Sequence, residues 1–183
     1  MAHYRNGVYV AFNGMGTTDP TKSDMKYYGL LQSWYKSKSI DFTFSDSHKK
    51  IYSVADTSTI TTLKSRLLER FKKSKVLLLI VTENASINRG LLNWEIEKAV
   101  ENYDLPIIVC YPKYYKIKMP SFHKKKWPLK LKEFTENEGV KTIHIPFKKD
   151  LITEAINSFS VHNPPSYTTG VFNDSIYEKY GME

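Results

Sequence analysis

Lys75-Val76-Leu77-Leu78-Leu79-Ile80-Val81 is the stretch that decides the fold, because six apolar residues follow the lysine without a break. A run of six is far shorter than the roughly 20 residues that a membrane-spanning helix needs. Continuous rather than alternating hydrophobicity indicates a strand buried on both faces, as is typical of a central parallel strand covered by helices. The run therefore predicts an α/β domain.

Strands and helices are predicted to alternate on either side of this run. Strand patterns cover residues 7–12, 41–44, 105–110 and 141–145, and helical patterns begin near residues 23, 58, 88 and 150. Strands that alternate with helices need right-handed crossovers, which place helices on both faces of a parallel sheet. The simplest arrangement is a flavodoxin-like three-layer sandwich with a five-stranded, mostly parallel sheet in the strand order 2-1-3-4-5.

The length of 183 residues fits one domain, which we expect to cover residues 1–162. Within it, residues 111–139 form an irregular segment rich in lysines and aromatic residues and interrupted by prolines. Residues 163–183 are predicted to leave the domain as a C-terminal tail after Pro164-Pro165.

The composition indicates an ordinary folded protein of a reducing compartment. Hydrophobic residues make up 41% of the chain and charged residues 25%, there is one cysteine, and the first residues lack the pattern of a secretory signal. We therefore expect a cytoplasmic location and no membrane partner.

The net charge of +8 would suit a polyanionic partner, and aromatic residues among the lysines of the irregular segment could stack on bases. No nucleic-acid-reading motif accompanies them, so a solvated lysine surface with the aromatics packed beneath it is favoured over a nucleic-acid site. The residues that carry this alternative are Tyr114, Tyr115, Phe122 and Trp127.

A functional site is expected at the carboxyl ends of the strands, where open parallel sheets bind ligands. This directs attention to the loops at residues 13–19, 45–50, 82–88 and from 111 onward. The five histidines are scattered and one cysteine stands alone, so no zinc-binding spacing is present. Gly14-Met15-Gly16 lacks the third glycine of a dinucleotide fingerprint, which argues against hydride transfer.

Glu95 stands out on the helix predicted over residues 88–103. At about 100° per residue, the stripe that contains it is otherwise apolar, with Leu91, Leu92, Ile96, Ala99 and Val100 as its members. A carboxylate in such a stripe must be paired, neutralised or kept wet by a cleft. In the structural alternative, Glu95 bonds to Lys98 or Arg89 at the edge of the stripe and does nothing more.

A family resemblance adds to this pattern. The ordered set Tyr9-Val10-Ala11-Phe12, Phe42 to Asp46, Leu63 to Arg70, Lys75 to Thr82 and Leu92 to Glu97 resembles Toll/interleukin-1-receptor-like (TIR-like) domains. Among these it is most similar to the bacterial group that includes the sensor component of the Thoeris anti-phage system.

The resemblance implies NAD⁺ cleavage with Glu95 as the catalytic residue, since a glutamate early in the third helix has that role in the family. It also implies that Phe12, Asn13, Gly14, Asp46 and His48 line the nucleotide pocket. Thr82 and Asn84 would complete its rim. No metal and no bound cofactor are implied, because NAD⁺ is the substrate.

The implied product is an ADP-ribose derivative, cyclic by analogy with the family, used as a signal in anti-phage immunity. The partners to expect are NAD⁺, further copies of the chain, a downstream effector reached through the nucleotide signal, and a phage-derived trigger. The main alternative is a non-catalytic TIR-like adaptor that acts by self-assembly or partner binding.

Overall fold

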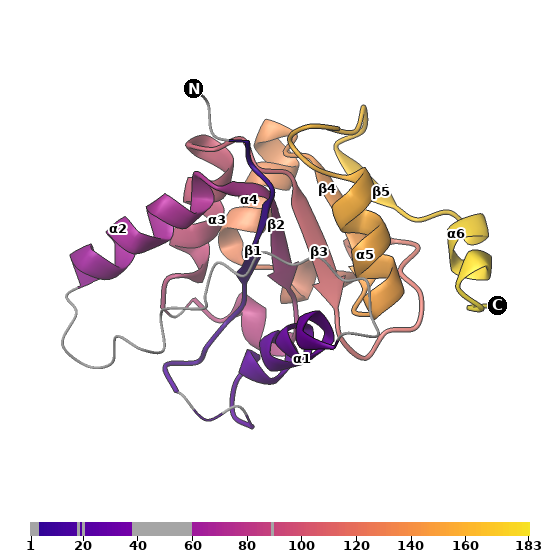
Figure 1. Cartoon of the computed structure of the whole chain (residues 1–183), viewed down its shortest axis with the longest axis horizontal. Coiled ribbons are helices and arrows are strands. Elements are labelled where there is room, and N and C mark those ends of the chain that lie inside the picture. The colour runs from indigo at the N-terminus through magenta and orange to yellow at the C-terminus, as the bar shows by residue number, and fades with distance from the viewer. Residues whose placement is uncertain (1–3, 18, 20, 38–59, 89) are drawn as a thin grey trace.

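Five parallel strands form the central sheet of the computed structural model, which describes residues 4–17, 19, 21–37, 60–88 and 90–183 (Figure 1). The strands lie side by side in chain order: β1 (Gly7–Ala11), β2 (Ser74–Ile80), β3 (Ile107–Tyr111), β4 (Thr142–Pro146) and β5 (Thr169–Val171). Each pair of neighbours in this sheet is parallel. The predicted α/β class with a parallel sheet is therefore confirmed.

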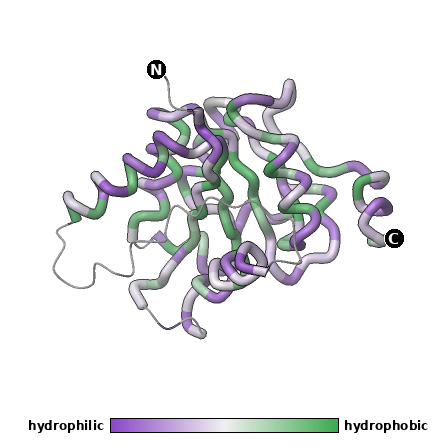
Figure 2. The backbone as a smooth tube through the Cα atoms, in the orientation of Figure 1, coloured by the Kyte–Doolittle hydropathy of each residue, from purple (hydrophilic) through white to green (hydrophobic). Residues whose placement is uncertain are grey.

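Helices cover both faces of the sheet. One face contacts α1 (Met25–Lys36), α5 (Lys149–Ser158) and α6 (Asp174–Lys179), and the other contacts α2 (Ile60–Phe71), α3 (Leu92–Glu101) and α4 (Leu129–Glu133) (Figure 1). The hydrophobic residues concentrate on the strands between these two layers (Figure 2). No helix in the described ranges is long and apolar enough to cross a membrane.

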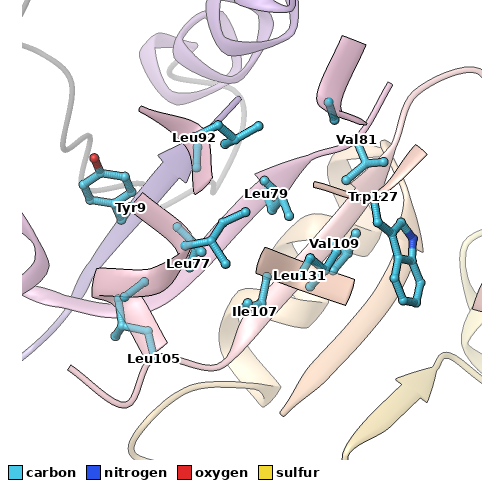
Figure 3. Close-up of a cluster of buried hydrophobic side chains, with 14 of the residues drawn as sticks. Tyr9, Leu77, Leu79, Val81, Leu92, Leu105, Ile107, Val109, Trp127 and Leu131 are labelled. Carbon is cyan, nitrogen blue, oxygen red and sulfur yellow. The ribbon is translucent and has the colours of Figure 1, made fainter. Parts of the chain in front are cut away.

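The central run at residues 76–81 is buried on both faces, as its sequence predicts. Leu78 and Ile80 face the α1 and α5 side, whereas Leu77 and Leu79 face α2, α3 and α4. Figure 3 shows the second of these clusters, in which Leu77 and Leu79 lie between Tyr9 and Val109. Alternating side chains thus enter two separate apolar layers, which is why the run needs no polar face.

The strand order differs in detail from the predicted 2-1-3-4-5. The predicted second strand, at residues 41–44, lies outside the described residues. The fifth strand of the described sheet is β5, which comes from the C-terminal segment and pairs with β4. The Thr142 backbone N–H donates to the Thr168 carbonyl oxygen over 2.8 Å. Pairing with β5 satisfies backbone groups that an open β4 edge would leave exposed.

The C-terminal segment does not leave the domain, contrary to the prediction from Pro164-Pro165. Tyr177 on α6 is fully buried, and its hydroxyl donates to the Ile117 carbonyl oxygen over 3.1 Å and accepts from the Ile117 N–H over 3.2 Å. These bonds satisfy the phenol and a loop peptide at once. They attach the C-terminal segment to the 111–139 segment.

The 111–139 segment, predicted to be irregular, contains short helical turns: η2 (Pro120–Lys126), α4 and η3 (Phe134–Glu138). Trp127 and Leu131 anchor it in the apolar layer beside Val109 (Figure 3). The aromatic residues of this segment differ in exposure: Trp127 is buried, whereas Phe122 is 76% exposed. Prolines interrupt this segment, so its helical turns are too short to show the periodicity by which a helix is predicted.

Candidate functional site

Glu95 lies in the first turn of α3, with only 7% of its surface exposed. The Tyr9 hydroxyl on β1 donates a hydrogen bond of 2.5 Å to Glu95 Oε1. Because β1 is one of the two edge strands of the described sheet, this pair lies near that side of the sheet, between β1 and α3. The predicted apolar stripe is confirmed on both sides of the carboxylate, since Leu92, Ile96 and Ala99 are buried.

Burial raises the pKa of Glu95 from its ordinary 4.5 to about 7. The hydrogen bond from Tyr9 and the positive charge of Arg70 on α2 lower this pKa, but they do not offset the loss of solvation. At neutral pH the group is therefore divided between its acid and carboxylate forms. A carboxylate poised in this way is characteristic of functional sites, although structural carboxylates also show it.

Aromatic rings hold the phenol that bonds to Glu95. The Tyr9 ring stacks on Phe71 of α2 at a centroid distance of 3.9 Å, and Phe71 stacks in turn on Tyr103 at 5.6 Å. Figure 3 shows Tyr9 at the margin of the apolar cluster, with its hydroxyl pointing away from Leu77. The position of the hydroxyl is thus fixed by packing rather than by a flexible chain.

The structural alternative for Glu95 named two partners, and the structure describes one of them. Lys98 pairs with Glu97 over 2.9 Å, on the outer side of α3, and not with Glu95. Arg89, the other partner considered, lies outside the described residues.

A second group of polar side chains gathers at the carboxyl ends of β1 and β2, around the buried carboxylate of Asp24. The Thr82 hydroxyl lies 2.9 and 2.8 Å from the two oxygens of Asp24, and Asn84 Nδ2 donates to Oδ1 over 3.2 Å. Burial raises the pKa of Asp24, while the bonds from Thr82 and Asn84 lower it. The predicted rim residues Thr82 and Asn84 therefore do lie together.

Asn13 joins the loop after β1 to the loop after β2. Its side chain is buried, and Nδ2 donates to the carbonyl oxygens of Asn84 and Ile87 over 2.7 and 3.1 Å. Its Oδ1 accepts from the Met15 N–H over 2.9 Å. All of these bonds join the Asn13 amide to backbone groups. Asn13 therefore holds the two loops together at the edge of the site.

The remaining predicted residues are placed as follows. Phe12 is half-buried and stacks on Tyr28 of α1 at 5.5 Å, on the sheet face opposite to Glu95. Gly14 has open space around it and accepts at its carbonyl oxygen from the Thr17 N–H over 3.1 Å. Asp46 and His48 lie outside the described residues.

A small pocket of about 150 Å³ opens beside Asp24, Thr82 and Asn84. Three lysines line it, namely Lys22 and Lys26 near the start of α1 and Lys113 after β3. A larger cavity of about 660 Å³ lies at the opposite edge, around the amino ends of β3 and β4, and none of the predicted site residues lines it. Of these two hollows in the described part of the chain, the lysine-lined pocket lies at the edge where parallel sheets bind ligands.

Two residues of this arrangement escaped the sequence analysis as site residues. Tyr9 belongs to the strand predicted over residues 7–12, and a tyrosine inside a buried strand needs a hydrogen-bond partner, which is the signal that could have identified it. Asp24 directly precedes α1, where an aspartate is a common helix cap, but its side chain makes no capping bond and points to Thr82 instead.

Thr82→Val is expected to lower the free energy of unfolding by about 1–3 kcal/mol, because the buried Asp24 carboxylate loses a hydroxyl donor while the side chain keeps its shape. Urea denaturation at pH 7 measures this loss. Thr153→Val is the matched control, since the Thr153 hydroxyl donates only to Lys149 of its own helix. Equal stability of Thr82→Val and wild type would show that the bonds from Thr82 to Asp24 do not stabilise the carboxyl ends of β1 and β2.

A comparison with protein families matches residues 9–117 of the chain to the TIR-like domain of the Thoeris protein ThsB. The match begins within β1, at Tyr9, and contains the Asp24 cluster, Glu95 and all of α3. It also covers more than half of the chain, including every described predicted site residue. The chain therefore belongs to the TIR-like domain family of the Thoeris protein ThsB, a family of anti-phage defence.

Proposed function

We propose that this protein cleaves the bond between nicotinamide and ribose in NAD⁺, with Glu95 as the catalytic residue. The observation that carries the proposal is the placement of Glu95, a nearly buried carboxylate held by Tyr9 within a TIR-like domain. Burial makes the ionised form of this carboxylate unfavourable in free energy, and a cationic ligand would offset that cost.

The reaction suits a single carboxylate. The bond from ribose C1′ to the ring nitrogen breaks, and its electron pair neutralises the cationic ring, so nicotinamide leaves without a general acid. Positive charge then develops on the ribose, as in the oxocarbenium-like state of glycoside hydrolysis. A fixed negative group beside the sugar stabilises that state more than the ground state, and Glu95 supplies it.

The product depends on the nucleophile that meets the ribosyl cation. Water adds to C1′, releases a proton and gives ADP-ribose. A hydroxyl or ring nitrogen of the same molecule gives a cyclic product instead. We propose a cyclic ADP-ribose derivative that signals to a downstream effector in the cytoplasm, with assembly of the chain or a phage-derived trigger switching the reaction on.

The lysine-lined pocket is our candidate for the phosphates of NAD⁺. Lys22, Lys26 and Lys113 are among the residues that line a space of about 150 Å³ at the expected ligand edge of the sheet, where Asp24 and Glu83 also line it. Lysine ammonium groups bind phosphate as point charges. Thr82 and Asn84 would then form the wall of the substrate site that the family resemblance assigns to them.

Lys113→Glu is expected to raise the KM for NAD⁺ about tenfold or more, because a charge-assisted bond to phosphate is replaced by repulsion. Initial rates at several NAD⁺ concentrations measure it. Lys73→Glu makes the same charge change in the turn before β2, at the far edge of the sheet, and should leave KM within about twofold. A similar rise in both variants would mean that overall charge, rather than this pocket, attracts the substrate.

The proposed function is tested by incubating the purified protein with NAD⁺, with and without extract from phage-infected cells, and analysing the products by mass. We expect nicotinamide and an ADP-ribose derivative from wild type and neither from Glu95→Gln. The adaptor alternative predicts no turnover in either condition, together with self-assembly or partner capture that Glu95→Gln leaves unchanged.

A further inference from the structure

The hydrogen bond between Tyr9 and Glu95 involves one of the two carboxylate oxygens. Oε1 accepts the Tyr9 hydroxyl over 2.5 Å, deep between β1 and α3. No hydrogen bond to Oε2 is present within the described part of the chain, and the residue keeps 7% of its surface exposed. One oxygen is therefore held by the protein, and the other carries no bond to the residues that the structure describes.

We propose that Tyr9 is a positioning residue for Glu95: its hydroxyl holds Oε1 so that Oε2 meets the ribose, and it keeps the carboxylate in the ionised form that the reaction uses. This inference rests on the proposed function. Tyr9 itself does not touch the substrate in this account, because its hydroxyl is occupied by Glu95.

The electrostatics favour a donor that keeps its proton. Burial, the charge of Glu95 and the bond to Glu95 all raise the pKa of the Tyr9 phenol well above its usual value. The bond lowers the pKa of Glu95 at the same time, because it stabilises the charged form of that group. The proton thus stays on Tyr9 throughout.

The other charged groups near Glu95 are few within the described residues. Arg70 on α2 acts on both members of the pair, lowering the pKa of Glu95 and that of Tyr9. On α3 itself, Glu97 and Lys98 pair with each other on the outer side of the helix. Among the described groups, Tyr9 is the one that hydrogen-bonds to the Glu95 carboxylate. It therefore has the most direct influence on the position and ionisation of that carboxylate.

The test is the pH profile of NAD⁺ cleavage in Tyr9→Phe, which keeps the ring on Phe71 and removes the hydroxyl. Loss of a hydrogen bond to a charged group should move the midpoint of the profile about one to two units to higher pH. Activity should fall roughly tenfold or more at pH 6.5 and recover to within about threefold of wild type at pH 9. A packing defect alone would lower the rate by the same factor at every pH.

Tyr103→Phe is the matched control, since Tyr103 also stacks on Phe71 but makes no bond to Glu95. Its profile should coincide with that of wild type. If Tyr9→Phe folds poorly, 3-fluorotyrosine at position 9 gives a test of opposite sign. This stronger donor of nearly the same shape should move the profile to lower pH.

A readout independent of turnover separates this inference from the proposed function. Carbon-13 NMR of the labelled Glu95 carboxyl group follows its titration directly in wild type and in Tyr9→Phe. A shift of the titration to higher pH in Tyr9→Phe supports the role of Tyr9, even if no NAD⁺ is cleaved and the proposed function fails. An unchanged titration and an unchanged pH profile overturn the inference, even if wild type cleaves NAD⁺.

Discussion

Trp127→Ala is expected to lower the free energy of unfolding by about 4 kcal/mol, one of the two largest stability effects we foresee. Trp127 is 1% exposed and fills the apolar layer next to Val109 and Leu131 (Figure 3). Its ring also stacks on His144 at a centroid distance of 5.1 Å. Removing the indole leaves a cavity in a close-packed layer, and the cost of that cavity adds to the lost transfer free energy.

The indole also begins a chain of buried hydrogen bonds. Trp127 Nε1 donates to the Tyr111 hydroxyl over 2.7 Å, and that hydroxyl lies 2.7 Å from His144 Nδ1. Because the indole is only a donor, we infer that the Tyr111 hydroxyl donates its own proton in a hydrogen bond to Nδ1, which accepts. Nε2 then carries the imidazole proton and donates it toward Thr142 Oγ1 over 3.1 Å. Burial lowers the pKa of His144 to about 3, which keeps the ring neutral at physiological pH.

Urea denaturation of three variants tests this account of Trp127. Trp127→Phe keeps most of the ring volume and should cost less than Trp127→Ala. Phe122→Ala removes an aromatic ring from the same segment at a position that is 76% exposed, and it should stay within about 0.5 kcal/mol of wild type. Similar losses for Phe122→Ala and Trp127→Ala would mean that the segment is not anchored by its tryptophan.

Glu95→Gln is expected to stabilise the protein by about 3 kcal/mol at pH 8 and to change little at pH 5. The pKa of Glu95 is about 7 in the folded protein against an ordinary 4.5, so the folded state binds the proton more tightly than the unfolded state. The stability that Glu95 contributes therefore falls as pH rises from 4.5 to 7 and stays low above that. Glutamine is neutral and can still accept the Tyr9 hydroxyl.

Thermal or urea unfolding at pH 5 and pH 8 measures the difference, with Glu97→Gln as the control on the same helix. The bond to Lys98 lowers the pKa of Glu97, so its replacement should give no gain at pH 8. A stabilised but inactive Glu95→Gln would be a trade of stability for function at one side chain. Equal stability of Glu95→Gln and wild type at both pH values would contradict the raised pKa.

The architecture could be predicted from the sequence because it depends on local patterns. The unbroken apolar run at residues 76–81 predicts a strand that helices cover on both faces. The apolar stripe around Glu95 predicts the buried face of α3. The same stripe identified Glu95 as the one carboxylate out of place, and the structure confirms its burial.

The partners of these residues could not be predicted, because they come from distant parts of the chain. Tyr9 and Glu95 are separated by 86 positions, and Asp24 and Thr82 by 58. β5 has only three residues, Thr169–Val171, and these are too few to show alternation. Pro164-Pro165 correctly signals a break in regular structure, but a break does not tell whether the chain returns to the sheet.

The central claim is that the Glu95 carboxylate stabilises the ribosyl cation during cleavage of NAD⁺. Its most direct test is the initial rate of nicotinamide release by wild type, Glu95→Gln and Glu97→Gln under the same activating conditions. We predict a loss of about a hundredfold or more in Glu95→Gln, on the scale of removing a key electrostatic group, and a rate within about twofold of wild type in Glu97→Gln. Nicotinamide release by Glu95→Gln at the wild-type rate would contradict the claim.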